Sequence, residues 1–218
     1  MKYSFVFLFL TALFLFTACD DDPTEEKAIL NYFPLAVGNY WIYDLYVIEA
    51  DGTERIYKSG IKREITREDI VSSLVGDFTY YILNEEGSPS NTFYFRKSGN
   101  DIYAPNMFYL SYANFIDTLY AGTVSASPNY ESEMYDISYK MELGTEIETP
   151  AGIFKETINR KATYYVYPRY QTEDLPDTRY LNEYYANNVG MILKEYTYIS
   201  FPHVTYQYRL VDYYIKEN

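Results

Sequence analysis

The chain has 218 residues, of which 48% are hydrophobic and 20% aromatic, and 31 acidic against 18 basic residues give a formal net charge of −13. The apolar content excludes a chain that is disordered throughout, because such chains contain too few apolar side chains to bury a core. The negative charge argues against nucleic acid as a partner, since phosphate backbones are bound by clusters of Lys and Arg.

The first 18 residues have the features of a secretory signal peptide. Lys2 precedes an apolar run over residues 5–16, and small residues follow at Thr17 and Ala18. The run is shorter than the roughly 20 residues that a membrane-spanning helix needs, and its proportions are those of a signal peptide. We therefore expect residues 1–18 to be removed, and we expect no membrane-spanning segment after them.

Cys19 is the only cysteine, so an internal disulfide is not expected. Residues 16–19, with the sequence FTAC, resemble the bacterial lipobox, in which the cysteine is acylated and becomes the mature N-terminus. Phe16 stands where Leu is more common. The resemblance implies palmitate on Cys19 and an anchor in the cell envelope, at the outer membrane, because several acyl chains together bind a membrane stably. The alternative is an ordinary signal peptide with an incidental cysteine beside its cleavage site.

An acidic run follows the cysteine at residues 20–26. Clustered like charges repel one another and stay solvated, so residues 19–31 are expected to form a flexible tether. The run also resembles the acidic export signal that directs lipoproteins of the phylum Bacteroidota to the cell surface. Both interpretations stay open, and with them the choice between a surface-exposed and a periplasmic domain.

The folded domain is expected to span residues 32–218 and to begin with a strong strand. Over residues 40–47 apolar residues alternate with more polar ones, and this period of two is typical of a half-buried strand. Asp51-Gly52 indicates a hairpin, with a return strand over residues 53–65. The residues of the first strand that are expected to face the core are Trp41, Tyr43, Leu45 and Val47.

Residues 66–75 interrupt the strand pattern. Residues 66–69 resemble a capping box, and the apolar residues after them are spaced for one face of a helix. The sequence therefore predicts a short helix here. Its apolar residues are Ile70, Val71, Leu74 and Val75.

The rest of the chain is predicted to form short strands separated by turns, with a hairpin around residues 86–91 and no clear pattern over residues 102–119. Gly152 and Gly190 lie beside strands, where a positive φ or close packing favours glycine. Together with 29 tyrosines, the pattern predicts a mainly β single domain with a strongly curved or partly closed antiparallel sheet and at most one or two short helices. The predicted strands cover residues 78–83, 92–96, 134–143, 146–148, 154–167, 179–186, 191–199 and 204–214.

Three phrases of the sequence point to a family. They are FPLAVGNYWIY at residues 33–43, TPAGIF at residues 149–154 and YYANNVGMILK at residues 184–194. They resemble recurring signatures of uncharacterised Bacteroidota lipoproteins, although Ile153 replaces the usual Thr of the second signature. The resemblance spans nearly the whole mature chain. It implies a curved antiparallel sheet like that of lipoprotein carriers, which cup a lipid chain, and it implies no active site.

The sequence offers few residues for catalysis or metal binding. His203 is the only histidine, so nucleophilic triads and a zinc site of His and Cys are excluded, and His203 itself is expected to be solvated. Residues 173–177 are acidic but lack the ligand spacing of a calcium loop, which favours a solvated loop. We therefore assign no catalytic residue, metal ligand or cofactor. A hydrolase that uses two carboxylates is the alternative, because such pairs leave no local mark in a sequence.

Residues 163–170 place tyrosines on both faces of a predicted strand. Tyr165, Tyr167 and Tyr170 are the candidate ligand-binding residues, because exposed rings stack on sugars or grip apolar groups. The alternative is that tyrosine simply covers the outer surface of the sheet.

We predict a non-catalytic envelope lipoprotein, held on a membrane by its lipid, that binds an apolar or glycan ligand or helps to assemble a surface complex. An accessory role in polysaccharide uptake is a further alternative.

Overall fold

The computed structural model describes residues 31–73, 76–87, 91–98, 101–104, 107–110, 120–122, 135–168, 178–198 and 201–216. Within these ranges the chain forms fourteen β-strands and no α-helix. Accordingly, the described residues include no helix with the length and apolar content needed to cross a membrane. The predicted signal peptide, Cys19 and the acidic run lie outside the described residues.

The strands are numbered in chain order. The first seven are β1 (Tyr40–Ile48), β2 (Glu54–Ser73), β3 (Gly76–Glu85), β4 (Thr92–Ser98), β5 (Asp101–Ala104), β6 (Met107–Leu110) and β7 (Tyr120–Gly122). The second seven are β8 (Tyr135–Leu143), β9 (Ile147–Thr149), β10 (Gly152–Phe154), β11 (Thr157–Val166), β12 (Thr178–Ala186), β13 (Gly190–Tyr198) and β14 (Phe201–Tyr214).

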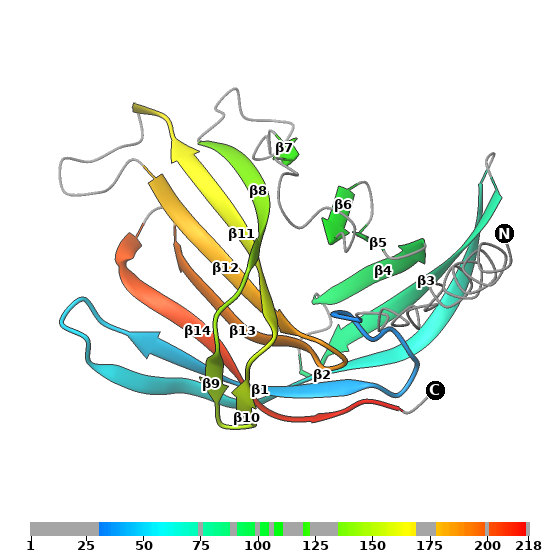
Figure 1. The fold of residues 1–218 in the computed structure, drawn as a ribbon, viewed down its shortest axis with the longest axis horizontal. Helices are drawn as coiled ribbons and strands as arrows, with labels where there is room; N and C mark the ends of the chain where they lie inside the picture. The colour runs from blue at the N-terminus through cyan, green and yellow to red at the C-terminus, as the bar shows by residue number, and fades with distance from the viewer. Residues whose placement is uncertain are drawn as a thin grey trace, which may run out of the picture.

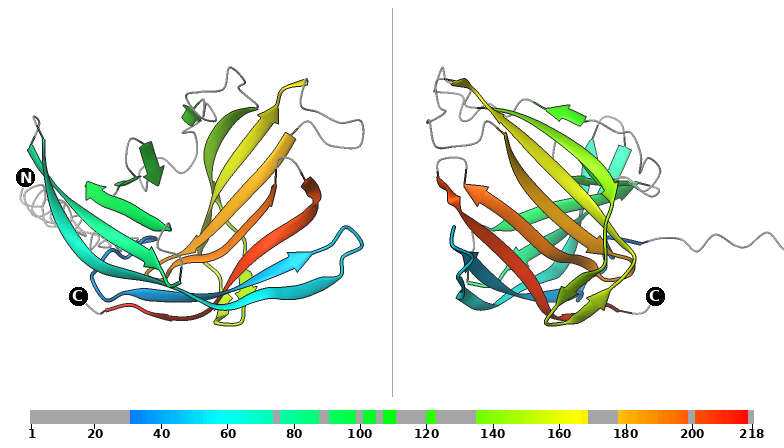
Figure 2. Two further views of the ribbon diagram at one scale, coloured as in Figure 1. Left: turned by 180° about the vertical axis from the view of Figure 1, so that it is seen from behind. Right: turned by 60° about the vertical axis from the view of Figure 1, so that its left-hand side comes forward.

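Twelve strands form one sheet in the order β6-β5-β4-β3-β2-β1-β14-β13-β12-β11-β8-β7, and β9 and β10 form a separate hairpin. Every paired strand is antiparallel to its neighbour. Figures 1 and 2 show the sheet bent into an open cup, in which β1 and β2 form the base, β11 to β13 rise on one side, and β3 and β4 rise on the other. The prediction of a mainly β chain with a strongly curved antiparallel sheet is confirmed.

The pairings of the base strand β1 with its two neighbours contain the irregularities that let the sheet curve. Its register with β14 shifts between Ile42 and Tyr43, and its register with β2 shifts on both sides of Leu45. An extra residue in one strand of a pair bends that strand and increases its twist. The extra residues lie in the two neighbours of β1, at Val211 in β14 and on both sides of Lys58 in β2. These two strands therefore bend beside β1 and turn the flanking parts of the sheet toward each other.

The alternation in β1 confirms the predicted core face. The four apolar residues chosen from the sequence are each no more than 7% exposed, and the residues between them are half-buried. Trp41, Tyr43 and Leu45 belong to one buried cluster that also includes Ile61 and Ile65 of β2 and Leu210 of β14. The core therefore lies against the concave side of the base. The four residues are Trp41, Tyr43, Leu45 and Val47.

The helix predicted for residues 66–75 is wrong. Residues 66–73 continue β2 and pair with β3, so that Ile70 lies opposite Thr79 and Val71 opposite Phe78. Ile70 and Val71, which suggested a buried helix face, are exposed instead, by 72% and 48%. Leu74 and Val75 lie outside the described residues. Branching at Cβ favours extended backbone at Ile70 and Val71, and the neighbouring strand supplies the backbone hydrogen bonds.

The other predicted elements agree with the structure in type. The hairpin around residues 86–91 joins β3 to β4, and the turn at residues 150–152 joins β9 to β10. The strand predicted over residues 154–167 is divided, because β10 ends at Phe154 and β11 begins at Thr157. Gly152 and Gly190 have φ angles of 139° and 103°, as the turn positions predicted.

Candidate ligand-binding site

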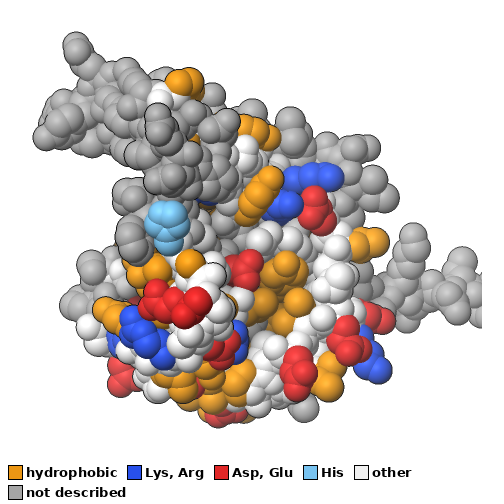
Figure 3. All heavy atoms as spheres, turned by 90° about the vertical axis from the view of Figure 1, so that its left-hand side faces the viewer, with side chains coloured by type: hydrophobic (Ala, Val, Ile, Leu, Met, Phe, Trp, Pro, Cys, Tyr) orange, Lys and Arg blue, Asp and Glu red, His pale blue; other side chains and the backbone are white. Residues whose placement is uncertain are grey.

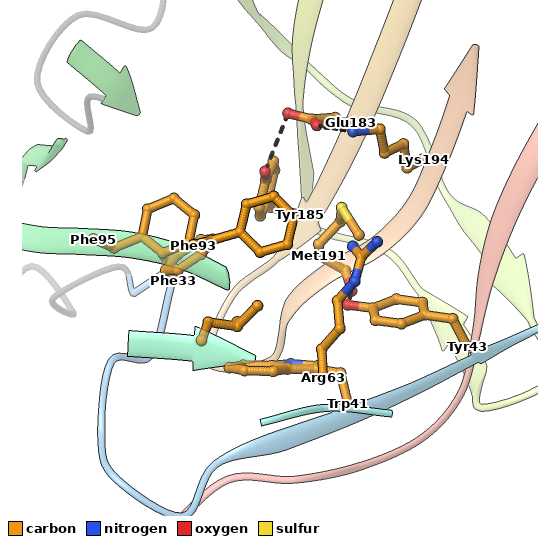
Figure 4. Close-up of a pocket in the computed structure, with 11 residues that line it drawn as sticks. Phe33, Trp41, Tyr43, Arg63, Phe93, Phe95, Glu183, Tyr185, Met191 and Lys194 are labelled. Carbon is orange, nitrogen blue, oxygen red and sulfur yellow. Dashed lines mark hydrogen bonds and ion pairs between the residues drawn. The ribbon is translucent and has the colours of Figure 1, made fainter. Parts of the chain in front are cut away.

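A cavity of about 80 Å³ lies inside the cup, where β1 to β4 approach β12 and β13 (Figure 4). Six of its eleven lining residues are aromatic, and only three are charged. Such a mainly apolar hollow with a few polar groups is typical of small-molecule sites. The lining residues are Phe33, Trp41, Tyr43, Arg63, Leu83, Phe93, Phe95, Glu183, Tyr185, Met191 and Lys194.

Two aromatic side chains of β1 are anchored across the cup by their polar atoms. Trp41 Nε1 donates to the carbonyl oxygen of Val189 at 2.6 Å, and the Tyr43 hydroxyl donates to the carbonyl oxygen of Met191 at 2.8 Å. A Cβ on Gly190 would lie 2.9 Å from Trp41 Nε1, so the close approach requires glycine there. The rings are therefore held rigidly, with their apolar faces toward the cavity.

The segment before β1 contributes Phe33 to the cavity wall. The backbone N–H of Asn188 donates to the carbonyl oxygen of Asn31 at 2.7 Å, and the N–H of Asn31 donates to the side chain of Asn187 at 2.7 Å. These bonds hold the segment against the β12–β13 turn. The Phe33 ring lies 5.9 Å from the Tyr185 ring, at an angle suited to aromatic packing.

A row of charged residues crosses β11, β12 and β13 beside the cavity. Sheet register places Arg160 opposite Glu183, and Glu183 opposite Lys194. Arg160 Nη1 lies 2.8 Å and Lys194 Nζ 3.0 Å from the Glu183 carboxylate, and the Tyr185 hydroxyl lies 3.3 Å from it. Directly opposite residues on one sheet face are near neighbours, so the register alone aligns these charges.

Glu183 is ionised although it is buried. Burial alone would raise the pKa of this carboxyl, but the positive charges and hydrogen bonds of Lys194 and Arg160 outweigh burial and lower it to about 2. At neutral pH the group therefore carries a full negative charge that is shared between two cations.

Arg63 reaches the cavity from β2. Its Nε and Nη2 atoms lie 2.9 Å from the carboxylate of Glu85, and its guanidinium lies 4.9 Å from the centre of the Tyr208 ring and 5.4 Å from that of Tyr43. Burial opposes the charged form, but Tyr43 and Glu85 together raise the pKa of Arg63 above its ordinary value. The guanidinium is therefore held as a fixed cation among aromatic rings.

Tyrosines of β13 and β14 extend the aromatic surface beyond Arg63. The rings of Tyr196 and Tyr206 stack with their centres 5.5 Å apart, and Tyr196 also stacks on Tyr208. Burial is the main reason that the pKa of Tyr196 is raised, so its hydroxyl stays neutral. The face in Figure 3 is hollowed, and hydrophobic side chains lie in the hollow between charged ones.

Two of the three tyrosines predicted to bind a ligand, Tyr165 and Tyr167, are not among the described residues that line this cavity. Tyr165 lies on β11 and is half exposed, and Tyr167 lies just after β11 and is partly exposed. Tyr170 and the acidic residues 173–177 lie outside the described residues. A binding role for these three tyrosines stays a prediction.

The described residues hold no cluster of three or more His, Cys, Asp and Glu side chains that would bind a metal ion. His203 lies on β14 and is exposed, as expected from the sequence.

Sequence reasoning did not identify the charged residues of the cavity. Trp41 and Tyr43 were predicted as core residues, and Tyr185, Met191 and Lys194 lie in one of the three family-like phrases, but Arg63 and Glu183 had no role. The sequence did contain one indication that Arg63 is part of a site. Arg63 falls two residues after Ile61 and two before Ile65, so a charge occupies an inward position of a strand whose neighbouring inward positions are apolar.

Comparisons with known proteins add little to this description. No protein-family model matches the chain, and no curated protein matches it. One similar solved structure is a candidate lipoprotein from Parabacteroides distasonis ATCC 8503, with 15% identity over 85% of this chain and 99% of that chain and a TM-score of 0.44. Another is a candidate exported protein with a YmcC-like fold from Bacteroides fragilis NCTC 9343, with 14% identity, the same coverage and a TM-score of 0.43. These likenesses are too remote to support a conclusion about function.

Proposed function

We propose that this protein is an acylated lipoprotein of the cell envelope whose cup-shaped sheet binds a small apolar ligand. The cavity is the observation that supports the binding role, because six aromatic rings from segments far apart in the chain converge on it. The polar atoms of Trp41 and Tyr43 are already satisfied by backbone carbonyls, so the rings offer mainly apolar contact. A volume of about 80 Å³ admits one end of a ligand, and the stacked tyrosines of β13 and β14 offer a surface for the rest.

The same geometry argues against hydrolysis at this cavity. Glu183 is the one carboxylate among the described residues that line it. Its pKa of about 2 makes it a poor general acid, since an acid catalyst must hold its proton near the working pH. We therefore propose a non-catalytic site.

Binding of octan-1-ol tests the proposal directly. Trp41 is the only tryptophan and lines the cavity, so its fluorescence reports on the site during a titration of the purified mature chain. We expect saturable binding to the wild type. Phe93→Ala removes an aromatic wall and should weaken binding roughly five- to tenfold, since each Å² of lost apolar contact costs about 25 cal/mol.

Tyr94→Ala is the matched control. Tyr94 neighbours Phe93 on β4, is exposed to a similar extent (42% against 39%) and does not line the cavity. Removal of the Tyr94 ring should leave the affinity for octan-1-ol unchanged. Absence of saturable binding to the wild type, or equal effects of the two substitutions, would overturn the proposal.

A further inference from the structure

A cluster of tyrosine hydroxyl groups lies beside the cavity on the concave face of the sheet. It consists of Tyr196 and Tyr198 of β13 and Tyr208 of β14, and we call it the tyrosine hydroxyl cluster. Tyr208 lies directly opposite Lys194, and the two tyrosines of β13 follow Lys194 at intervals of two residues. Side chains at such positions share one face of a sheet. Because Lys194 lines the cavity, the cluster lies on the cavity side.

The three hydroxyl groups are hydrogen-bonded to one another. Tyr196 shares one hydrogen bond with Tyr198 and another with Tyr208. A hydroxyl group has one donor and two acceptor sites. Within the described part of the chain, the two bonds of the cluster therefore leave most of its acceptor sites available to donors of a ligand. The Tyr198 side chain is 49% exposed, so the cluster is reachable from solvent.

Two cations that line the cavity supply hydrogen-bond donors next to this cluster. Arg63 uses Nε and Nη2 on Glu85, and its guanidinium lies 4.9 Å from the centre of the Tyr208 ring. Lys194 Nζ lies 3.0 Å from the Glu183 carboxylate. A guanidinium has five donors and an ammonium has three, so both cations keep donors beyond these ion pairs.

The head of a ligand at this place must both donate and accept hydrogen bonds. A wholly apolar group would cover these donors and acceptors without replacing their hydrogen bonds to water, which is costly. A carboxylate accepts hydrogen bonds and donates none, so it would suit the cations but not the acceptor sites of the tyrosines. Hydroxyl groups do both. A head with several hydroxyl groups fits the cluster and the cations together.

We infer that the ligand is an amphiphile whose neutral head group carries several hydroxyl groups, with its apolar part in the aromatic cavity and its head between the tyrosine hydroxyl cluster, Arg63 and Lys194. The inference rests on the proposed binding function and names the class of ligand. Figure 4 shows Lys194 on the side of the cavity away from Phe33 and Phe95, so the head and the apolar part have separate places. Alkyl glycosides and glycerol esters share the required chemistry.

Four probes with the same eight-carbon chain test the head group. They are octan-1-ol, octyl β-D-glucoside, 1-octanoylglycerol and octanoate, each used below the concentration at which it forms micelles. In a titration followed by Trp41 fluorescence, we expect octyl β-D-glucoside or 1-octanoylglycerol to bind roughly tenfold more tightly than octan-1-ol, which is the effect of one or two net hydrogen bonds. The tighter of the two shows whether the head is a sugar or glycerol. Octanoate, which donates no hydrogen bond, should bind less tightly than that probe.

Tyr208→Phe tests the role of the cluster, because it removes one hydroxyl group and keeps the ring that stacks on Tyr196. The ratio of the affinity for the tighter hydroxylated probe to that for octan-1-ol should fall roughly fivefold. Tyr180→Phe is the matched control. It makes the same change on β12, at a tyrosine that is outside the cluster and does not line the cavity, and it should keep the wild-type ratio.

The outcomes separate the inference from the proposed function. If octan-1-ol binds the wild type as tightly as both hydroxylated probes, or if octanoate binds more tightly than either, the inference is overturned and the proposed function stands. The inference also fails if Tyr208→Phe keeps the wild-type ratio. If none of the four probes binds, the proposed function fails with it.

Discussion

Glu183 keeps its negative charge inside the sheet because Arg160 and Lys194 flank it in the cross-strand row. The arrangement links the protonation of this side chain to folding. In the unfolded chain the carboxyl binds a proton near pH 4.5, whereas in the folded protein it stays ionised down to about pH 2. Folding stability from this group is therefore present above pH 4.5 and is lost as the pH falls toward 2.

We expect Glu183→Gln to remove this part of the pH dependence. In the wild type, Glu183 contributes about 3 kcal/mol to the fall in the free energy of unfolding between pH 4.5 and pH 2. Urea unfolding at several pH values, followed by Trp41 fluorescence, measures this slope. Glu148→Gln changes an exposed carboxylate on β9 and serves as the control. If both variants keep the wild-type slope, Glu183 is not the linked group.

Gly190 is the second residue on which the cavity depends. It combines a φ of 103° with close contact to the Trp41 ring. Gly190→Ala should lower the free energy of unfolding by about 1–3 kcal/mol, because alanine is strained at this positive φ. The close contact of the new Cβ with the Trp41 ring should lower it further. Gly38→Ala is the matched control, because Gly38 has a φ of 97° and open space where a Cβ would lie. Equal losses in the two variants would show that the contact with Trp41 costs nothing.

At the scale of elements, β2 has two parts with different surroundings. Its first part lies in the base of the cup, where Ile65 is fully buried, and its second part extends with β3, where Ile70 is largely exposed. The same strand is thus a core element at one end and a solvent-exposed ribbon at the other. Its apolar residues must differ in their contribution to stability.

One substitution made at two positions of β2 tests this difference. Ile65→Val should cost about 1 kcal/mol, since it removes a methylene from a packed site. Ile70→Val should change the free energy of unfolding by less than about 0.5 kcal/mol. Thermal or urea unfolding of the two variants gives the comparison. Equal costs would mean that the ribbon is covered in solution.

At the scale of the molecule, the proposed location depends on lipid at Cys19, which lies outside the described residues. We expect metabolic labelling with palmitate to mark the wild type and to fail for Cys19→Ser. The physical reason is that acylation needs the thiol of this one cysteine. Equal labelling of both proteins would exclude lipidation at Cys19.

The side of the membrane that the domain faces is a separate question. If the acidic run at residues 20–26 acts as a surface-export signal, protease added to intact cells should digest the domain. Replacement of that run by Ser and Gly should then protect the domain until the cells are lysed. Protection of the wild-type domain in intact cells would place it in the periplasm.

The sequence by itself determined the type of most elements and which side chains of β1 face the core. A period of two in β1 identified Trp41 and Tyr43 as inward residues, and turn residues located the hairpins around residues 86–91 and 150–152. These features are local, because alternation and positive φ angles depend on neighbouring residues. The helix predicted for residues 66–75 failed because local spacing does not reveal that a second strand, β3, lies alongside.

Only the tertiary structure decided the cavity and its charges. Arg63, Glu183 and Lys194 come from three strands, and they meet because of the register of β12 with β13 and the bend of the sheet at β1. The sequence of a strand shows which side chains share a face, but it does not show which residue of another strand lies opposite. Pairing is chosen by the free energy of the whole sheet, and this is why the candidate site was visible only once the strands were in place.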